Sequence, residues 1–376
     1  MTPVARVPRT ARSTLASKTS LAPLRGRRRR KVAFVLGGGG NLGALQVGQL
    51  RALHERGVRA DLVVGCSVGA MNGAAYAVRP SPLGIGVLED LWLQLAEDPA
   101  RTMPGTWMPS TVSLFRRGAS IYPSSGLRAS IEQFLGDARR FDDLAVPFEC
   151  VATDVDANAE TWFSAGDLVE PILASAALPS VYPMVSIDGR RYLDGGVVNN
   201  VPISRAIEAR ATRIYVLHVG PHGTPDRPVH RPIDVALIAY WIARNARFAA
   251  DLANVPKGVE VIVLPARRRP DLRFDDFGAS AELIIEGHRT ATEYLDELER
   301  DVEGPAGRSA RRRDDRDDRE VDRGVDGDGE AEGEDAADPW GERLATELRR
   351  VVEELRGFAS RNATHETVTK PGGPDR

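Results

Sequence analysis

Residues 60–74 read ADLVVGCSVGAMNGA and divide into an apolar run, a turn and a series of small residues. The apolar residues 62–64 are typical of a short buried strand, and the small residues that follow the turn suit a helix. The turn, Gly65-Cys66-Ser67-Val68-Gly69, has the Gly-x-Ser-x-Gly pattern that lifts a serine clear of a sheet between strand and helix. Gly65 and Gly69 allow the tight bend. This order predicts a nucleophile elbow with Ser67 as the nucleophile; a plain turn between strand and helix is the alternative.

A glycine-rich segment precedes the elbow by one predicted helix. Residues 31–36 are an apolar run of strand type, residues 37–43 read GGGGNLG, and residues 44–56 carry leucines at roughly helical spacing. Together with residues 62–64 they form a strand–helix–strand unit, which implies a right-handed crossover and parallel strands. The sequence therefore predicts an α/β fold with a mainly parallel central sheet flanked by helices.

The glycine-rich segment permits two functional interpretations. Gly38, Gly40 and Gly43 fit the Gly-x-Gly-x-x-Gly pattern of a dinucleotide site, but that site needs an acidic residue at the end of the second strand, where the elbow stands. Consecutive glycine N–H groups at a helix N-terminus also bind anions. Because neighbouring parallel strands end side by side, we expect an oxyanion hole beside the elbow, built from Gly38, Gly39 and Gly40, with the N–H of Val68 as a further donor.

Asp194 is the second candidate catalytic residue. It ends a predicted strand and is followed by Gly195 and Gly196, which predicts a sharp, open turn with room for another group. Asn199 and Asn200 are expected to cap the helix that begins after Pro202.

The histidines decide between a catalytic triad and a dyad. A triad in elbow order needs a serine, then an acid, then a histidine. Five histidines follow the elbow, and none lies in a local signature: His218, His222, His230, His288 and His365. A serine–aspartate dyad therefore remains open beside a triad.

Composition suggests a globular domain between unequal ends. The 376 residues carry a net charge of −3, and the cysteines, Cys66 and Cys150, form no disulfide framework, which suits a reducing compartment. No segment reaches the roughly 20 apolar residues of a membrane span. We expect residues 1–30 to be a disordered basic arm, although a transit peptide also fits, and residues 31–300 to form the globular domain.

The C-terminal part is expected to contain a linker and a helix. Residues 301–338 are rich in charge and glycine and predict a disordered linker. Residues 339–360 predict an amphipathic helix that docks on the domain, pairs with a partner or lies on a membrane, and residues 361–376 a disordered tail.

Taken together, these motifs resemble the patatin-like phospholipase family, in particular its bacterial cytoplasmic members. The resemblance runs from Lys31 to about Leu298 and rests on the segments 37–43 and 65–69, on 179–185, and on Asp194-Gly195-Gly196 with Asn200 and Pro202. It implies a three-layer sandwich in which Ser67 is the nucleophile, Asp194 the base of a Ser-Asp dyad, and Gly38 to Gly40 the oxyanion hole. It also implies hydrolysis of acyl esters of phospholipids or other glycerolipids, with no metal or other cofactor.

One position departs from the family pattern. The family usually carries Arg or Lys just before the last glycine of the loop, where this chain has Leu42. The departure bears on rate and headgroup preference more than on reaction type. It also keeps two alternatives open: a triad esterase with His218, His222 or His288 as base, and a catalytically weak protein that binds lipid or a partner.

The expected location is cytoplasmic. Peripheral contact with the inner membrane surface would run through the basic arm or the C-terminal helix. The arm could also touch nucleic acid, which we consider the less favoured partner.

Overall fold

The computed structural model of the protein describes residues 30–98, 120, 122–220, 232–266 and 276–314. From residue 31 onward these residues build one eight-stranded sheet in the order β5-β6-β3-β2-β1-β7-β8, with β4 paired to β3. The strands are β1 (Val32–Leu36), β2 (Leu62–Cys66), β3 (Phe148–Asp154), β4 (Ala159–Phe163), β5 (Val185–Ile187), β6 (Arg190–Asp194), β7 (Arg213–Leu217) and β8 (Glu260–Val263). Pairing is parallel from β3 through β2, β1 and β7 to β8, and antiparallel where β4, β5 and β6 join.

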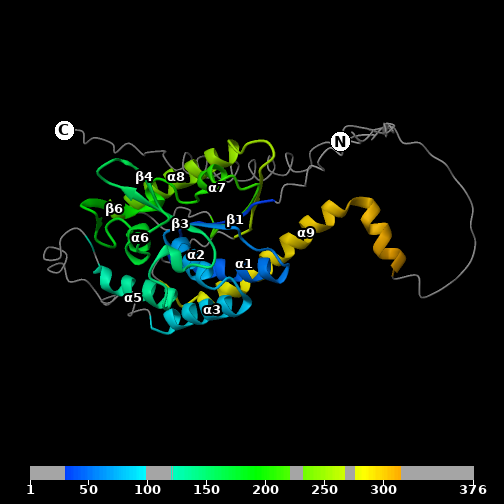
Figure 1. Cartoon of the computed structure of the whole chain (residues 1–376), viewed down its shortest axis with the longest axis horizontal. Helices are drawn as coiled ribbons and strands as arrows, with labels where there is room; N and C mark the ends of the chain where they lie inside the picture. The colour runs from blue at the N-terminus through cyan, green and yellow to red at the C-terminus, as the bar shows by residue number, and fades with distance from the viewer. Residues whose placement is uncertain (1–29, 99–119, 121, 221–231, 267–275, 315–376) are drawn as a thin grey trace, which may run out of the picture. The chain divides into compact units, whose positions relative to one another are not determined.

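Helices cover both faces of this sheet. They are α1 (Ala44–Glu55), α2 (Val68–Val78), α3 (Pro82–Glu97), α5 (Ser124–Leu135), α6 (Val169–Ser175), α7 (Ile203–Glu208), α8 (Pro232–Ala253) and α9 (Ser280–Asp314), with short 3₁₀ turns η1 (Gly40–Gly43), η3 (Phe141–Asp143) and η4 (Gly195–Val197). Figure 1 shows α7 and α8 on one face and α1, α2, α3 and α9 on the other.

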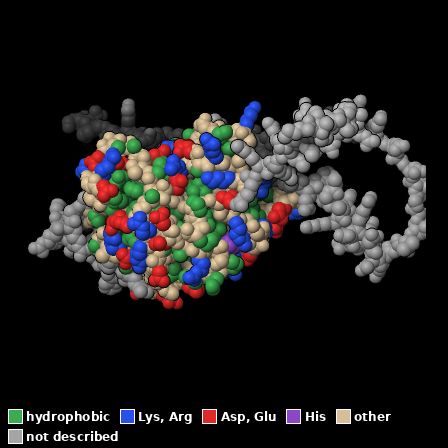
Figure 2. Space-filling model, viewed as in Figure 1, with side chains coloured by type: hydrophobic (Ala, Val, Ile, Leu, Met, Phe, Trp, Pro, Cys, Tyr) green, Lys and Arg blue, Asp and Glu red, His purple; other side chains and the backbone are tan. Residues whose placement is uncertain are grey.

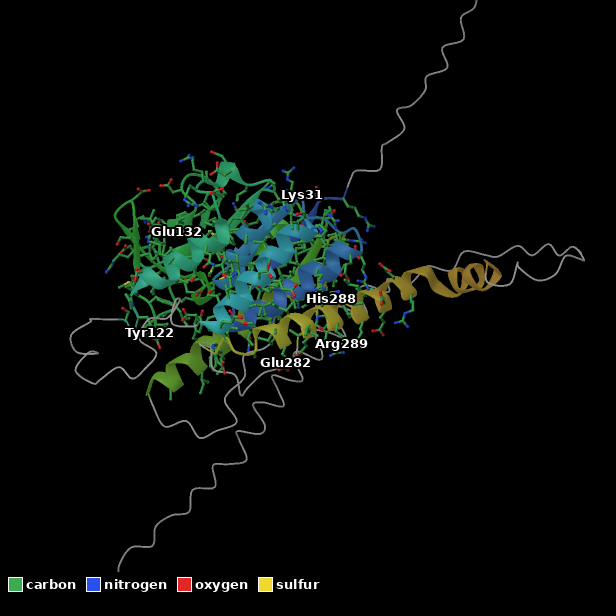
Figure 3. The ribbon with its side chains drawn as sticks, turned by 90° about the horizontal axis from the view of Figure 1, so that it is seen from below. Lys31, Tyr122, Glu132, Glu282, His288 and Arg289 are labelled. Carbon is green, nitrogen blue, oxygen red and sulfur yellow. The ribbon has the colours of Figure 1, made fainter. Side chains whose placement is uncertain are left out.

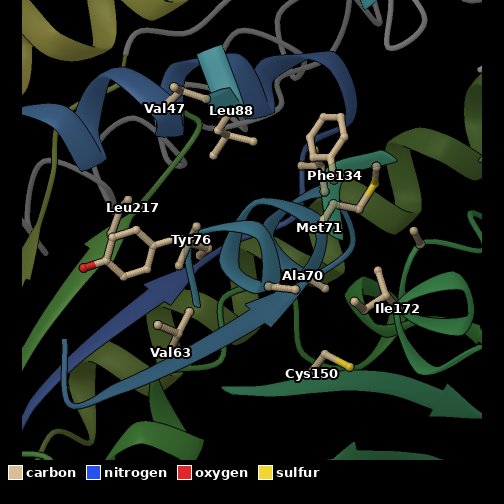
Figure 4. Packing of buried hydrophobic residues seen from close by; sticks show 14 of the residues in the cluster. Val47, Val63, Ala70, Met71, Tyr76, Leu88, Phe134, Cys150, Ile172 and Leu217 are labelled. Atoms are coloured by element: carbon tan, nitrogen blue, oxygen red, sulfur yellow. The ribbon is translucent and has the colours of Figure 1, made fainter. Parts of the chain in front are cut away.

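The two faces of β1 bury into separate cores, because successive side chains of a strand point to opposite sides. Phe34 and Leu36 join the larger core under α1, α2 and α3, whereas Ala33 and Val35 join the smaller core under α7 and α8. Figure 4 shows part of the larger core, where side chains of α2 pack on the sheet. The predicted three-layer α/β architecture with a mainly parallel central sheet is thus confirmed.

Helix α9 packs against α1 through two glycines. A Cβ at Gly48 would overlap the backbone of α9 at Ile284, and a Cβ at Gly287 would overlap the backbone of α1 at Leu45. The two helices therefore touch backbone to backbone, and Figure 3 shows α9 running past α1 along this face.

The length of α9 corrects one sequence expectation. The predicted helix ends near Leu298 and the predicted linker begins at residue 301, whereas α9 continues to Asp314. The added segment includes Pro305, which has no backbone N–H to donate, so the helical backbone continues there without one of its hydrogen bonds. The expectations for residues 1–29 and 315–376 lie outside the described residues.

The described residues show neither a membrane-spanning helix nor, on the face seen in Figure 2, a surface of a single charge. No described helix combines the length and the apolar content that crossing a bilayer requires. The face seen in Figure 2 mixes basic and acidic side chains among apolar ones.

Replacing Gly48 with alanine should destabilise the protein. The new methyl group would push α1 and α9 apart, and overpacking of this kind costs about 1–3 kcal/mol. Urea unfolding followed by circular dichroism measures the change. Gly86→Ala in α3 is the matched control, because a Cβ there meets no atom within 4 Å and the better helix propensity should add about 0.5–1 kcal/mol. Equal stability of the two variants would contradict the tight α1–α9 contact.

Candidate active site

Ser67 stands on the turn between β2 and α2, as predicted. Its backbone has φ 55° and ψ −127°, a conformation that a non-glycine residue rarely adopts and that often marks a functional turn. Its N–H donates to Ser175 Oγ at 3.0 Å, which anchors the turn to α6. The flanking glycines let the elbow pack closely against its neighbours. A Cβ at Gly69 would overlap the carbonyl oxygen of Leu36 in β1, and a Cβ at Gly65 would collide with the backbone of α2.

The edge of β3 brings Asp194 to Ser67. Along this edge Val151 pairs with Cys66 of β2, and the next residue, Ala152, pairs with Asp194 of β6. Because β4 occupies the other edge of β3, β2 and β6 meet end to end. Ser67, directly after Cys66, therefore faces Asp194, and Ser67 Oγ donates to Asp194 Oδ2 at 2.6 Å across 127 residues of sequence.

The Asp194 carboxylate is buried, with 1% of the residue exposed. Its Oδ1 accepts the N–H of Gly196 at 2.7 Å, and it also accepts a hydrogen bond from the Tyr240 hydroxyl. Burial raises the pKa of Asp194 above its ordinary value, because the charged form loses its hydration. The hydrogen bonds from Ser67 and Gly196 and the charge of Arg244 act in the opposite direction. The result is a carboxylate with increased proton affinity beside a serine hydroxyl.

The glycine loop lies beside the elbow because β1 and β2 pair in parallel, with Leu36 opposite Gly65. Side-chain amides hold its ends: Gln46 Nε2 donates to the carbonyl of Gly37 at 2.8 Å, and Asn72 Nδ2 donates to that of Gly43 at 2.9 Å. Trp92 Nε1 in turn donates to Asn72 Oδ1 at 2.9 Å. Three buried polar side chains thus fix the loop from the side of α1, α2 and α3.

The predicted oxyanion donors differ in availability. Gly39 and Gly40 line the pocket, and so does Val68, whose N–H opens α2 and has no intrahelical acceptor. The N–H of Gly38 instead donates to the carbonyl of Asn200 at 3.1 Å. The structure therefore brings Gly39, Gly40 and Val68 to the site, and Gly38 contributes through its carbonyl oxygen rather than its N–H.

Three contributing residues escape sequence interpretation. Asn200 does not cap α7, which has no side-chain cap; its Nδ2 donates to the carbonyl of Gly38 at 3.2 Å. Tyr240 and Arg244 lie on α8, and Arg244 Nη2 donates to the same carbonyl at 2.7 Å. The Asn-x-Pro pattern at residues 200–202, after Asp194, is the one sequence feature that associated any of these three residues with the site.

No described histidine completes a triad. His218 is half-buried and stacks on Phe248, and its Nδ1 accepts the N–H of Gly220. Loss of hydration and the charge of Arg244 lower its pKa to about 4. His288 lies on α9, where Figure 3 labels it, and its Nε2 lies 2.7 Å from Glu55 Oε2. Neither lines the pocket, and His222 lies outside the described residues.

The pocket above Ser67 is mainly apolar. It encloses a cavity of about 100 Å³ that reaches Ser67 and Asp194 at one end. Its apolar wall comes from α2, α3, α5 and the segments after α6 and before α9: Met71, Trp92, Leu95, Leu127, Phe134, Ala176, Leu178, Val181, Tyr182 and Phe277. Asn200, Tyr240, Trp241 and Arg244 form the remaining wall. Among the described residues, no three His, Cys, Asp or Glu side chains are grouped to hold a metal ion.

Comparison with protein families and curated proteins gives a consistent picture. The patatin-like phospholipase family model matches residues 34–207, which include the loop, the elbow and Asp194. Patatin-like phospholipase domain-containing protein 7 of Rattus norvegicus is 32% identical over 213 residues, covering 56% of this chain and 15% of the relative. An uncharacterised NTE family protein of Mycobacterium bovis is 28% identical over 232 residues, covering 62% of this chain and 60% of that protein. The chain thus spans a small part of the rat relative's length.

Solved structures are more distant. VipD from Legionella pneumophila aligns with a TM-score of 0.39 and 14% identity over 71% of this chain and 67% of that one. ExoU, in its heterodimeric complex with SpcU from Pseudomonas aeruginosa, aligns with a TM-score of 0.37 and 15% identity over 71% and 51%.

Asp194→Asn should stabilise the folded protein more at pH 8 than at pH 4. A carboxyl whose pKa is raised in the folded state costs stability as the pH rises from its unfolded value through its folded value, because the folded state must then release the proton it holds more tightly. Asparagine keeps the shape without the ionisation. Melting temperatures of both proteins between pH 4 and pH 8 measure the effect, and a difference that stays constant or shrinks with pH would contradict it.

Proposed function

Because the patatin-like phospholipase family model matches residues 34–207, we propose that this protein is a serine lipid acyl hydrolase that cleaves carboxylic esters of phospholipids or other glycerolipids. The observation that carries the proposal is the 2.6 Å hydrogen bond from Ser67 Oγ to the buried carboxylate of Asp194, at the end of an apolar pocket. An activated hydroxyl and a base within hydrogen-bond reach are the minimum of nucleophilic acyl transfer.

The proposed reaction begins when Ser67 Oγ attacks the ester carbonyl while its proton passes to Asp194. The tetrahedral oxyanion forms against the N–H groups of Gly39, Gly40 and Val68, and each such donor is worth about 3 kcal/mol in the transition state. As the C–O bond to the alcohol breaks, Asp194 returns the proton to the departing oxygen. Asp194 then takes a proton from the water that attacks the acyl-enzyme. As the bond from the acyl carbon to Ser67 Oγ breaks, Asp194 returns this proton to Ser67 Oγ and the fatty acid is released.

The raised proton affinity of Asp194 supports its role as base. A base works best when its pKa approaches the working pH, and an exposed aspartate would be too weak. Burial raises the pKa of Asp194, which is the direction that a base requires, and the hydrogen bond from Ser67 orients the proton that has to be transferred.

The pocket supports an acyl substrate. Along its apolar side the ring centroid of Trp92 lies 6.2 Å from that of Phe134, in a T-shaped arrangement, and 6.0 Å from that of Phe277, in a tilted one. Such a wall favours methylene groups, each worth about 0.8 kcal/mol on burial.

The two alternatives predict different behaviour. A triad esterase needs a histidine near Ser67, and neither of the two described candidates, His218 and His288, lines the pocket. A catalytically weak binding protein would keep the pocket without an activated serine. The paired Ser67 and Asp194 favour the dyad over both.

Ser67→Ala should abolish activity. Removing the nucleophile should lower ester hydrolysis by about 10³-fold or more, and should end labelling by a fluorophosphonate probe, which reacts only with an activated serine. Release of p-nitrophenol and of fatty acid from phospholipid vesicles measures turnover. Asp194→Asn should lose a comparable factor.

Ser81→Ala is the matched control, because Ser81 caps α3 outside the pocket and its loss costs about 1 kcal/mol of stability. Retained hydrolysis in Ser67→Ala refutes the mechanism. If the wild-type protein does not react with the probe, the result supports the binding protein. If activity is lost on substitution of His218 or His288 but retained in Asp194→Asn, the result supports the triad.

Leu178→Trp should shorten the accepted acyl chain. Leu178 is half-buried in the pocket wall, so a larger side chain there removes space for several methylene groups. Relative to p-nitrophenyl butyrate, kcat/KM for the laurate ester should fall about tenfold. Leu83→Trp, at a residue 70% exposed on α3, should leave that ratio unchanged. If the laurate-to-butyrate ratio of kcat/KM is unchanged in both variants, the acyl chain does not bind against Leu178.

A further inference from the structure

The glycine loop has no cation at position 42. Leu42 is buried, with 7% of the residue exposed, and packs into the larger hydrophobic core. A long charged side chain at this position would leave the core or disrupt it. Any positive charge beside the loop must therefore come from elsewhere in the fold.

Arg244 on α8 reaches the loop from the opposite side. Its Nη2 donates to the carbonyl oxygen of Gly38 at 2.7 Å, and Asn200 Nδ2 donates to the same oxygen at 3.2 Å. The guanidinium lies 5.1 Å from the ring centroid of Tyr240, and only 9% of Arg244 is exposed. A guanidinium held by a ring and a carbonyl in this way has a fixed position.

The bond to Gly38 acts on the neighbouring oxyanion donor. The carbonyl of Gly38 and the N–H of Gly39 belong to one planar peptide group. A charged donor on the carbonyl oxygen draws electron density through the group, so that the N–H becomes a stronger donor. The same bond holds the peptide plane, and with it the direction of the Gly39 N–H.

We propose that Arg244 is the positioning residue of the oxyanion hole and supplies, from α8 and through the Gly38–Gly39 peptide, the positive charge that the loop lacks at position 42. The proposal rests on the proposed function. Arg244 acts on the site through that peptide rather than by direct contact with the reacting atoms.

The same guanidinium affects the base. The groups that face Asp194 are Ser67 from the start of α2, Cys66 from β2, the N–H of Gly196 from η4, and Tyr240 and Arg244 from α8. Arg244 is the cation among them and favours the ionised carboxylate. Its removal should raise the pKa of Asp194, so that the acid limb of activity moves to higher pH.

The experiment compares pH–rate profiles for p-nitrophenyl butyrate. Arg244→Gln and Arg244→Met should lower kcat by about 10- to 100-fold with little change in KM, and should shift the acid limb of kcat/KM to higher pH. Arg244→Lys keeps the charge and should restore the acid limb and part of kcat. Methionine replaces the aliphatic part of the arginine side chain without its charge and packs on an aromatic ring, so it provides a second test if glutamine prevents folding.

Arg247→Gln is the control on the same helix. Arg247 pairs with Asp251 at 3.0 Å and does not line the pocket, so the kcat and the acid limb of the Arg247→Gln protein should match those of the wild type. If folded Arg244→Gln or Arg244→Met has the wild-type kcat and acid limb, the inference about Arg244 is overturned. The proposed function still stands in that case if the probe labels Ser67. Equal losses in Arg247→Gln also overturn it, because they would reflect displacement of α8. A wild type that neither hydrolyses esters nor reacts with the probe overturns both.

Discussion

The parallel pairing of β1 with β2 is the contact on which the rest of the site depends. Because Leu36 lies opposite Gly65, the two strands end together and their turns leave the sheet side by side. The turns then approach until Gly69 touches the backbone of β1, a distance that no Cβ would permit. The elbow and the loop are therefore one packed unit, and whatever fixes one of them fixes the other.

Buried polar side chains make that unit rigid. Gln46 and Asn72 hydrogen-bond the loop from one layer of helices, where Trp92 in turn holds Asn72. Asn200 and Arg244 hold the loop from the other layer. An unsatisfied polar group in such a place would cost about 1–3 kcal/mol, so each bond also fixes the side chain that makes it. The loop is thus clamped between two cores, with Gly39 and Gly40 lining the pocket.

The Asp194 carboxylate works against stability in this arrangement. Burial removes most of its hydration, and the donors around it replace that hydration only in part, so its proton affinity stays raised. A structure selected for stability alone would place an apolar side chain here. The carboxylate's cost in stability and its proposed use as a base have the same origin, which is its exclusion from water.

The sequence by itself determined the local units. Apolar runs, glycines and helical spacing identified the strand–elbow–helix at Ser67, the glycine loop and the α/β class, because these depend on neighbouring residues. Asp194 stood out only through its turn and a family resemblance. The hydrogen bond between Asp194 and Ser67 depends on β3, because neighbouring residues of β3 pair with the ends of β2 and β6. The proposed role of Arg244 depends on a contact across 206 residues. Only the tertiary structure decided these, because no local pattern records which strand ends and helix faces the sheet will bring together.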